Sequence, residues 1–130
     1  MDSSTDPLAR PLAAMALGRI ALGIGSLASP GGMARGFGAR PSAELDYMTR
    51  VFGARAIALG LAYLMAPPPQ RTRLQRLCLG VDLSDTVAGI SELVRPAGAP
   101  RAAIGGAVAL TGAYAAVGAA RFVADLQRRR

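Results

Sequence analysis

Three carboxylates lie in an otherwise apolar stretch, residues 79–93, which reads LGVDLSDTVAGISEL. Because residues three, four and seven apart share one face of an α-helix, Asp82, Asp85 and Glu92 are predicted to form one polar face. A charged side chain at the centre of a bilayer costs about 3 kcal/mol, so such a face needs cationic partners, water or a bound group. The spacing therefore fits three kinds of chemistry: ion pairing between helices, passage of protons or a solute, and binding of a head group.

Two arginines inside other apolar stretches supply partners for these acids. Counted by helical rise from the ends of their segments, Arg19 lies level with Asp82 and Asp85, and Arg55 lies level with Glu92. We expect a deep cluster of Arg19 with Asp82 and Asp85 and a shallower Arg55–Glu92 contact, with an Arg55–Asp85 contact as the alternative. Two guanidinium groups leave one carboxylate unmatched, and that acid is then protonated, hydrated or ligand-bound. The candidate site is an intramembrane charge cluster of Arg19, Arg55, Asp82, Asp85 and Glu92.

No other set of residues in the sequence predicts catalytic or metal chemistry. The chain has neither His nor Lys, which excludes a Ser/His/Asp triad and a Ser–Lys pair. Asp82-x-x-Asp85 supplies two carboxylates, too few for a hard-cation cage. The single cysteine, Cys78, excludes an intrachain disulfide and a cysteine-based metal cluster. We therefore expect no enzymatic activity, no cofactor and no metal.

Four apolar segments must carry these charges, and Pro or Gly marks the end of each. At about 1.5 Å per residue, each nearly crosses a hydrocarbon core of about 30 Å. A soluble helical bundle is disfavoured because residues 102–120 contain no charged side chain and so present no polar face to water. The sequence predicts an all-α fold, a single integral-membrane domain over residues 1–130. Its four transmembrane helices, about 12–29, 44–66, 77–94 and 102–123, run up-down-up-down.

Small residues are predicted to pack these helices, because sixteen glycines and many alanines allow close backbone approach. One ridge on the second segment repeats every four residues, and two more lie on the fourth segment: Ala54, Ala58, Ala62 and Ala66; Gly105, Ala109 and Ala113; Gly112, Ala116 and Ala120. Away from the polar face, four apolar side chains are predicted to face lipid: Leu79, Leu83, Ile90 and Leu93. Three tyrosines near segment ends are predicted to anchor at the membrane surface: Tyr47, Tyr63 and Tyr114.

The net charge and the positions of the arginines predict the cellular location of the protein. All fifteen basic residues are Arg, the net charge is +7 and the pI is about 11.2, but the arginines flank the apolar segments, so we expect no nucleic-acid partner. The side that holds both termini and the 67–76 loop carries eight arginines: Arg10, Arg71, Arg73, Arg76, Arg121, Arg128, Arg129 and Arg130. The other side carries five: Arg35, Arg40, Arg50, Arg95 and Arg101. This excess predicts a multi-pass protein of the bacterial inner membrane with both termini cytoplasmic.

Three short motifs carry a family resemblance. The run LGRIALG at 17–23, followed by a Pro-Gly turn, FGARAIALGL at 52–61 and the Asp82-x-x-Asp85 spacing resembles small four-helix bacterial membrane proteins of unknown function, of the actinobacterial type. The likeness covers about the first two thirds of the chain. The resemblance implies the four-helix fold and the membrane address, and it implies no activity.

Two function classes follow from these observations. The leading hypothesis is a structural or accessory-subunit role in the lipid bilayer, as a homo-oligomer or within a larger membrane complex. The alternative is a small proton-linked or solute transporter, or a lipid or cofactor head-group binding protein, that uses Arg19, Arg55, Asp82 and Asp85. A dry and fully paired cluster favours the structural role, whereas a water-accessible cavity reaching Asp82 or Asp85 favours transport.

Overall fold

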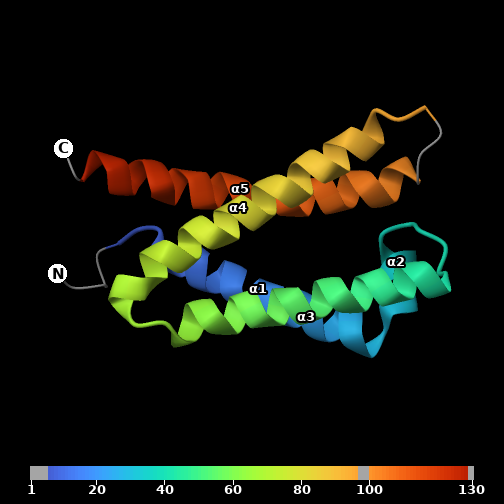
Figure 1. Ribbon diagram of the computed structural model, residues 1–130, viewed down its shortest axis with the longest axis horizontal. Coiled ribbons are helices and arrows are strands. Elements are labelled where there is room, and N and C mark those ends of the chain that lie inside the picture. Colours follow the sequence, from blue (N-terminus) through green and yellow to red (C-terminus); the bar gives the residue numbers. More distant parts are fainter. Residues whose placement is uncertain (1–5, 97–99, 129–130) are drawn as a thin grey trace.

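The computed structural model describes residues 6–96 and 100–128 of the chain. Over these residues the regular elements are five helices and no strands, which confirms the predicted all-α class (Figure 1). The helices are α1 (Ala9–Ala28), α2 (Pro30–Gly36), α3 (Ala43–Met65), α4 (Pro68–Leu93) and α5 (Arg101–Gln127). The short α2 replaces the turn expected after the first segment. Gly38 follows it with a φ of 80°, a left-handed conformation that turns the chain towards α3.

The third predicted segment begins earlier than the sequence suggested. Residues 67–76 were expected to form a loop, but α4 starts at Pro68 and includes all three arginines of RTRLQR. Proline suits the first turn of a helix, because its missing N–H would have no partner there. The Nε of Arg71 donates to the carbonyl of Ala66 at 2.9 Å, which caps the end of α3 and keeps the connection tight.

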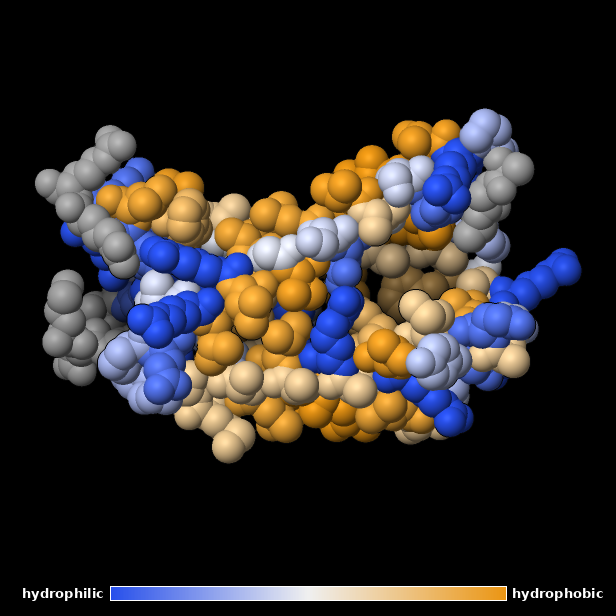
Figure 2. All heavy atoms as spheres, viewed as in Figure 1, coloured by the Kyte–Doolittle hydropathy of each residue, from blue (hydrophilic) through white to orange (hydrophobic). Residues whose placement is uncertain are grey.

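Three helices of the described chain, α1, α3 and α5, are long and apolar enough to cross a membrane. Helix α4 is not among them, because it carries arginines in its first turns and the three acids of the predicted polar face. Figure 2 shows hydrophobic side chains over much of the middle of one face, with a hydrophilic group among them, and more hydrophilic side chains at the two ends. Both described ends of the chain lie at the same end of the molecule, beside the α3–α4 connection (Figure 1).

The helices form two hairpins, α1 with α3 and α4 with α5, and α2 packs on α3. Glycine brings α1 and α3 into backbone contact. A Cβ on Gly23 would lie 2.6 Å from the Gly53 carbonyl, and one on Gly60 would lie 2.6 Å from the Ala16 carbonyl. The α3 face that packs is therefore Gly53, Ala56 and Gly60, all buried. Ala54 and Ala58, the first two members of the alanine ridge predicted for α3, are exposed and do not pack within this chain.

The second hairpin is also closed by glycines, but by different ones from those predicted. On α5 the buried small residues are Ala115 and Gly118. Leu79 of α4 lies over Gly118, where an added Cβ would be 3.2 Å from the leucine Cδ1, so the prediction that Leu79 faces lipid is wrong. Four alanines of the predicted α5 ridges are exposed: Ala109, Ala113, Ala116 and Ala120. The packed faces are those on which a large side chain from the neighbour covers a glycine.

Candidate functional site: charge pairs between the two hairpins

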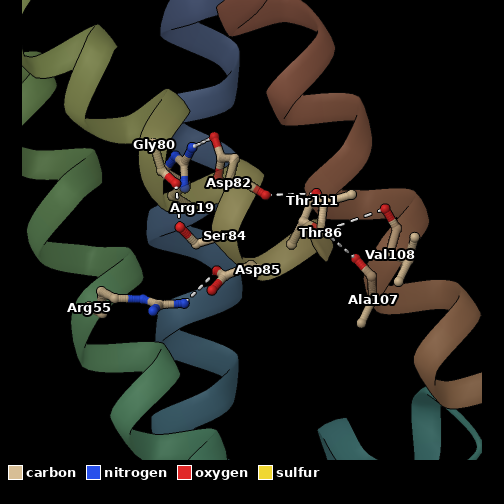
Figure 3. Close-up of polar contacts among 10 residues, drawn as sticks. All are labelled: Arg19, Arg55, Gly80, Asp82, Ser84, Asp85, Thr86, Ala107, Val108 and Thr111. Atoms are coloured by element: carbon tan, nitrogen blue, oxygen red, sulfur yellow. Dashed lines mark hydrogen bonds and ion pairs between the residues drawn. The ribbon is translucent and has the colours of Figure 1, made fainter. Parts of the chain in front are cut away.

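The most buried charges in the described chain join the two hairpins. Arg19 lies on the packed face of α1, between Ala16 and Gly23, and its Nη2 is 2.5 Å from Oδ2 of Asp82 on α4 (Figure 3). Arg19 is 8% exposed and Asp82 is 2% exposed. The structure thus contains the Arg19–Asp82 half of the cluster expected from the sequence, whereas Asp85 pairs with Arg55 and not with Arg19. Each charge is buried, so each depends on the other for compensation.

Arg19 has a second partner on the second hairpin. Its guanidinium carbon lies 4.7 Å from the centroid of the Tyr114 ring, which is a cation–π geometry. Gly18 makes this possible, because a Cβ at that position would lie 2.6 Å from the Tyr114 hydroxyl oxygen. Tyr114 lies near the middle of α5, so its predicted role as an anchor near a segment end is wrong. The adjacent pair Gly18-Arg19 therefore attaches α1 to both α4 and α5.

The second pair lies between α3 and α4. Nη2 of Arg55 is 2.5 Å from Oδ2 of Asp85, and the two side chains are 45% and 27% exposed (Figure 3). The Arg55–Glu92 contact expected from the sequence is wrong, and the alternative Arg55–Asp85 contact is the one found. Glu92 instead pairs with Arg95, three residues further along, at 3.2 Å. Asp85 and Glu92 are about 10 Å apart along the helix, further than one arginine spans.

These pairings correct the predicted charge balance. Three guanidinium groups meet three carboxylates, because Arg95 joins the cluster, so the expected unmatched acid is absent from these three. Arg95 was assigned to the membrane flank by its place after the apolar segment. The local rule that residues three apart on a helix can pair would have found it. The cluster is therefore neutral when all its members are charged.

Hydroxyl groups extend the polar contact into the second hairpin. The Thr86 hydroxyl on α4 and the Thr111 hydroxyl on α5 lie 3.0 Å apart and form a hydrogen bond between the helices (Figure 3). Thr86 Oγ1 also lies 2.6 Å from the carbonyl of Asp82, one turn earlier. The hydrogen bond therefore fixes the rotation of α4 relative to α5 at the level of Asp82. The side chain of Asp82 is thereby directed at Arg19.

A separate ion-pair group, at the end of the molecule where the described chain begins and ends, was missed by the sequence reasoning. Asp6 accepts a hydrogen bond from Arg121 of α5, and Arg128 lies 3.9 Å away. The backbone N–H of Leu8 donates to Asp6 Oδ1 at 3.1 Å, just before α1 begins. Burial alone would raise the pKa of Asp6, but the hydrogen bonds from Arg121 and Leu8 outweigh it and the pKa is lowered. The place of an Asp ahead of a helix was the available indication.

Two small cavities flank the Arg19–Asp82 pair. The first, about 30 Å³, includes Met15, Tyr63 and Cys78 in its lining. The second, about 20 Å³, extends past Phe52 and Thr111. Arg19 and Asp82 line both, and each cavity has room for one or two water molecules. Among the described residues, no three His, Cys, Asp or Glu side chains are grouped to hold a metal ion. The arrangement neutralises buried charge and joins helices.

Comparison of the chain with protein-family models, with curated proteins and with solved structures gives no match. The resemblance to small four-helix bacterial membrane proteins stays a prediction. The geometry of the charge pairs is therefore the basis for a functional proposal.

Proposed function

We propose that this chain is a small integral membrane protein with a structural or accessory-subunit role, in which a buried ion pair joins two transmembrane hairpins. The observation that carries the proposal is the Arg19–Asp82 pair, because both partners are almost fully buried and belong to different hairpins. Buried ion pairs contribute little net stability but fix which helices pack and in what register. Of the helices around this pair, α1, α3 and α5 are apolar, and the helix contacts are packed through glycine, as in membrane bundles.

The proposal makes α4 the fourth transmembrane helix. Unpaired acids would disfavour insertion of α4 into a membrane. In the structure each of its three acids has an arginine partner, which reduces that cost. The arginines of α4 itself all lie in its first turns, at the end of the molecule where the described chain begins and ends. The excess of arginine at that end supports a cytoplasmic location for both termini in a bacterial inner membrane. A second copy of this chain, or a larger membrane complex, would be the partner.

The sizes of the cavities favour the structural role over transport of a solute. Room for one or two waters on either side of Arg19 and Asp82 does not accommodate a substrate molecule. The paired state of the acids also removes the negative site that a bound cation would need. The polar groups between the hairpins are therefore better explained as packing elements.

Charge reversal tests the proposal. Arg19→Asp should reduce membrane accumulation and detergent stability, since it leaves two acids facing each other. Arg19→Asp with Asp82→Arg should partly restore both. Arg95→Ala is the matched control, because its pair with Glu92 is exposed and worth less than about 1 kcal/mol. Insertion and topology are measured by carbonate extraction and by reporter fusions at the termini. Arg19→Ala with normal insertion and stability would refute the pairing role.

Proton transfer is a second candidate, favoured by the two cavities on either side of Asp82. Water in both would place a titratable carboxylate between two hydrated spaces. Proton flux into liposomes that contain the purified protein tests this idea. Flux that is abolished by Asp82→Asn and kept by Glu92→Gln would establish it, and wild-type liposomes no leakier than empty ones would exclude it.

A further inference from the structure

The two interhelical ion pairs differ in exposure. The side chains of Arg19 and Asp82 are 9% and 3% exposed, whereas those of Arg55 and Asp85 are 45% and 27% exposed. Arg55 lies near the middle of α3, so in the proposed membrane arrangement this open pair faces the bilayer interior. Ionised side chains in transmembrane segments almost always face a protein interior or a water-filled cavity. Arg55 and Asp85 line the second small cavity on one side, but the exposed parts of their side chains have no cover in a single copy, which implies a covering surface outside it.

Four small side chains lie next to the open pair, together with Phe52, whose ring centroid is 5.9 Å from the guanidinium carbon of Arg55. On α3 the pair is flanked by Ala54 and Ala58, and on α4 by Ser84 and Ala88, and all four are exposed. A helix laid against this face would meet no bulky side chain at those four positions and would approach the charges closely. On the face drawn in Figure 2, hydrophilic groups interrupt the hydrophobic middle band.

The orientation of the pair makes the face complementary to itself. Figure 3 shows Arg55 reaching across from α3 to Asp85 on α4, so the positive group comes from one helix and the negative group from its neighbour. A two-fold rotation about the membrane normal keeps depth unchanged and exchanges left for right across the contact. Arg55 of one copy would then face the partner's Asp85, and Asp85 would face the partner's Arg55.

We propose that this face is a homodimer interface in which four charges alternate in sign around the two-fold axis. Six residues form it: Ala54, Arg55, Ala58, Ser84, Asp85 and Ala88. The inference rests on the proposed membrane arrangement, since exposure of the pair is unfavourable there and tolerated in water. The pair is neutral, so it offers no net charge to attract an anionic head group. A second copy with the same orientation in the membrane satisfies both charges at once.

Charge reversal in two coexpressed variants tests whether Arg55 and Asp85 pair between copies. If they acted only within one chain, coexpression would not restore association. Arg55→Asp places four acids around the axis in a homodimer, and Asp85→Arg places four arginines there. Coexpression of the two variants restores opposite charges across the interface, because each acid of one copy faces an arginine of the other, while the like charges within each copy remain. With two affinity tags, we expect copurification in mild detergent to fall about tenfold or more for each variant alone and to recover for the mixture. The proposal would be overturned if either variant alone copurified with itself as well as the wild-type protein does. It would also be overturned if both variants accumulated in the membrane but copurification did not recover on coexpression.

Cysteine cross-linking gives a second test that leaves the charges intact, in case the reversed variants fail to fold. In a Cys78→Ala background, Ser84→Cys lies beside the axis, and Ala109→Cys on α5 is exposed and lies outside the proposed face. Oxidation in native membranes by copper(II)–phenanthroline joins two thiols as a disulfide and reduces two copper ions. We expect a covalent dimer for Ser84→Cys and little for Ala109→Cys. Equal cross-linking of both, or of neither, would refute the interface.

The two proposals fail in different ways. Release of the wild-type protein by carbonate extraction would refute the membrane arrangement itself. If the wild-type protein stays in the membrane but two tagged copies do not copurify and Ser84→Cys gives no covalent dimer, only the homodimer is refuted. Capture of some other membrane protein by the Ser84→Cys variant, without self-cross-linking, would assign the face to a different partner and overturn the proposal.

Discussion

Gly18 of α1 lies directly against the hydroxyl group of Tyr114 on α5, at a position where a Cβ would come within 2.6 Å of the hydroxyl oxygen. The same ring lies 4.7 Å from the guanidinium carbon of Arg19. The absence of a side chain at residue 18 therefore sets the distance between an aromatic ring and a buried cation one residue further along.

Gly18→Ala should displace the Tyr114 ring from Arg19 and destabilise the protein by about 1–3 kcal/mol, the usual cost of overpacking. Thermal unfolding in detergent measures the effect. Gly80→Ala is the matched control, because a Cβ there meets nothing within 4 Å and should be neutral or stabilising. Adding Tyr114→Phe should relieve part of the loss, since it removes the atom that clashes. Equal stability of Gly18→Ala and Gly80→Ala would contradict this account.

Gly23→Ala should separate α1 from α3, because its Cβ would lie 2.6 Å from the Gly53 carbonyl and backbone atoms yield little. A loss of about 1–3 kcal/mol is expected from overpacking at a helix crossing. Denaturant titration in mixed micelles gives the measurement. Gly105→Ala, which adds a methyl group in open space on α5, serves for comparison. The prediction is wrong if Gly23→Ala and Gly105→Ala have the same denaturant midpoint.

Thr86 and Thr111 should show energetic coupling across the α4–α5 contact. A double-mutant cycle with Thr86→Val and Thr111→Val is expected to give a coupling energy of about 0.6 kcal/mol, the average for hydrogen bonds between transmembrane helices, which α4 and α5 are in the proposed arrangement. Unfolding free energies of the four proteins supply the number. Ser91→Val, whose hydroxyl contacts only its own helix, should show no coupling with Thr111→Val. Additive effects of the two threonine substitutions would argue against the hydrogen bond.

Asp6 should confer acid sensitivity. Its pKa is lowered in the folded protein, so the ionised carboxylate stabilises the fold at neutral pH. That stabilisation is complete above the unfolded pKa of about 3.9 and is lost as pH falls through the lower folded value. Between about pH 5 and pH 3, the melting temperature of the wild-type protein should fall more than that of Asp6→Asn. Parallel curves for the two proteins would show that the Asp6 group contributes nothing to folding.

The helical class and the deepest ion pair were predictable from the sequence for simple reasons. Proline and glycine mark segment ends through backbone geometry alone, and comparing depths along neighbouring helices places Arg19 beside Asp82. The same comparison failed for Arg55, because it counted depths from the segment ends as if the two helices ran side by side. In the structure α4 begins at Pro68 and crosses the molecule obliquely, which brings Asp85 to Arg55 (Figure 1).

The choice of packing face could not be predicted from spacing. In α3 the alanines at 54 and 58 and the set Gly53, Ala56 and Gly60 are both regular rows of small residues. Only the second row meets the α1 backbone, and that depends on where Gly23 and Ala16 lie after folding. Likewise, nothing in the spacing of Tyr114 indicates Arg19, because their contact requires α5 to fold back against α1.

Only Ala66 and Pro67 separate α3 from α4, and Arg71 is hydrogen-bonded back to that junction. In the proposed membrane arrangement, such a short connection would deliver α3 and α4 to the translocation machinery together. The least apolar helix would then partition into lipid together with its neighbour, with Asp85 already opposite Arg55. In that arrangement the short connection would make insertion of α4 depend on α3, so lengthening this junction should impair biogenesis even if every packing contact could still form.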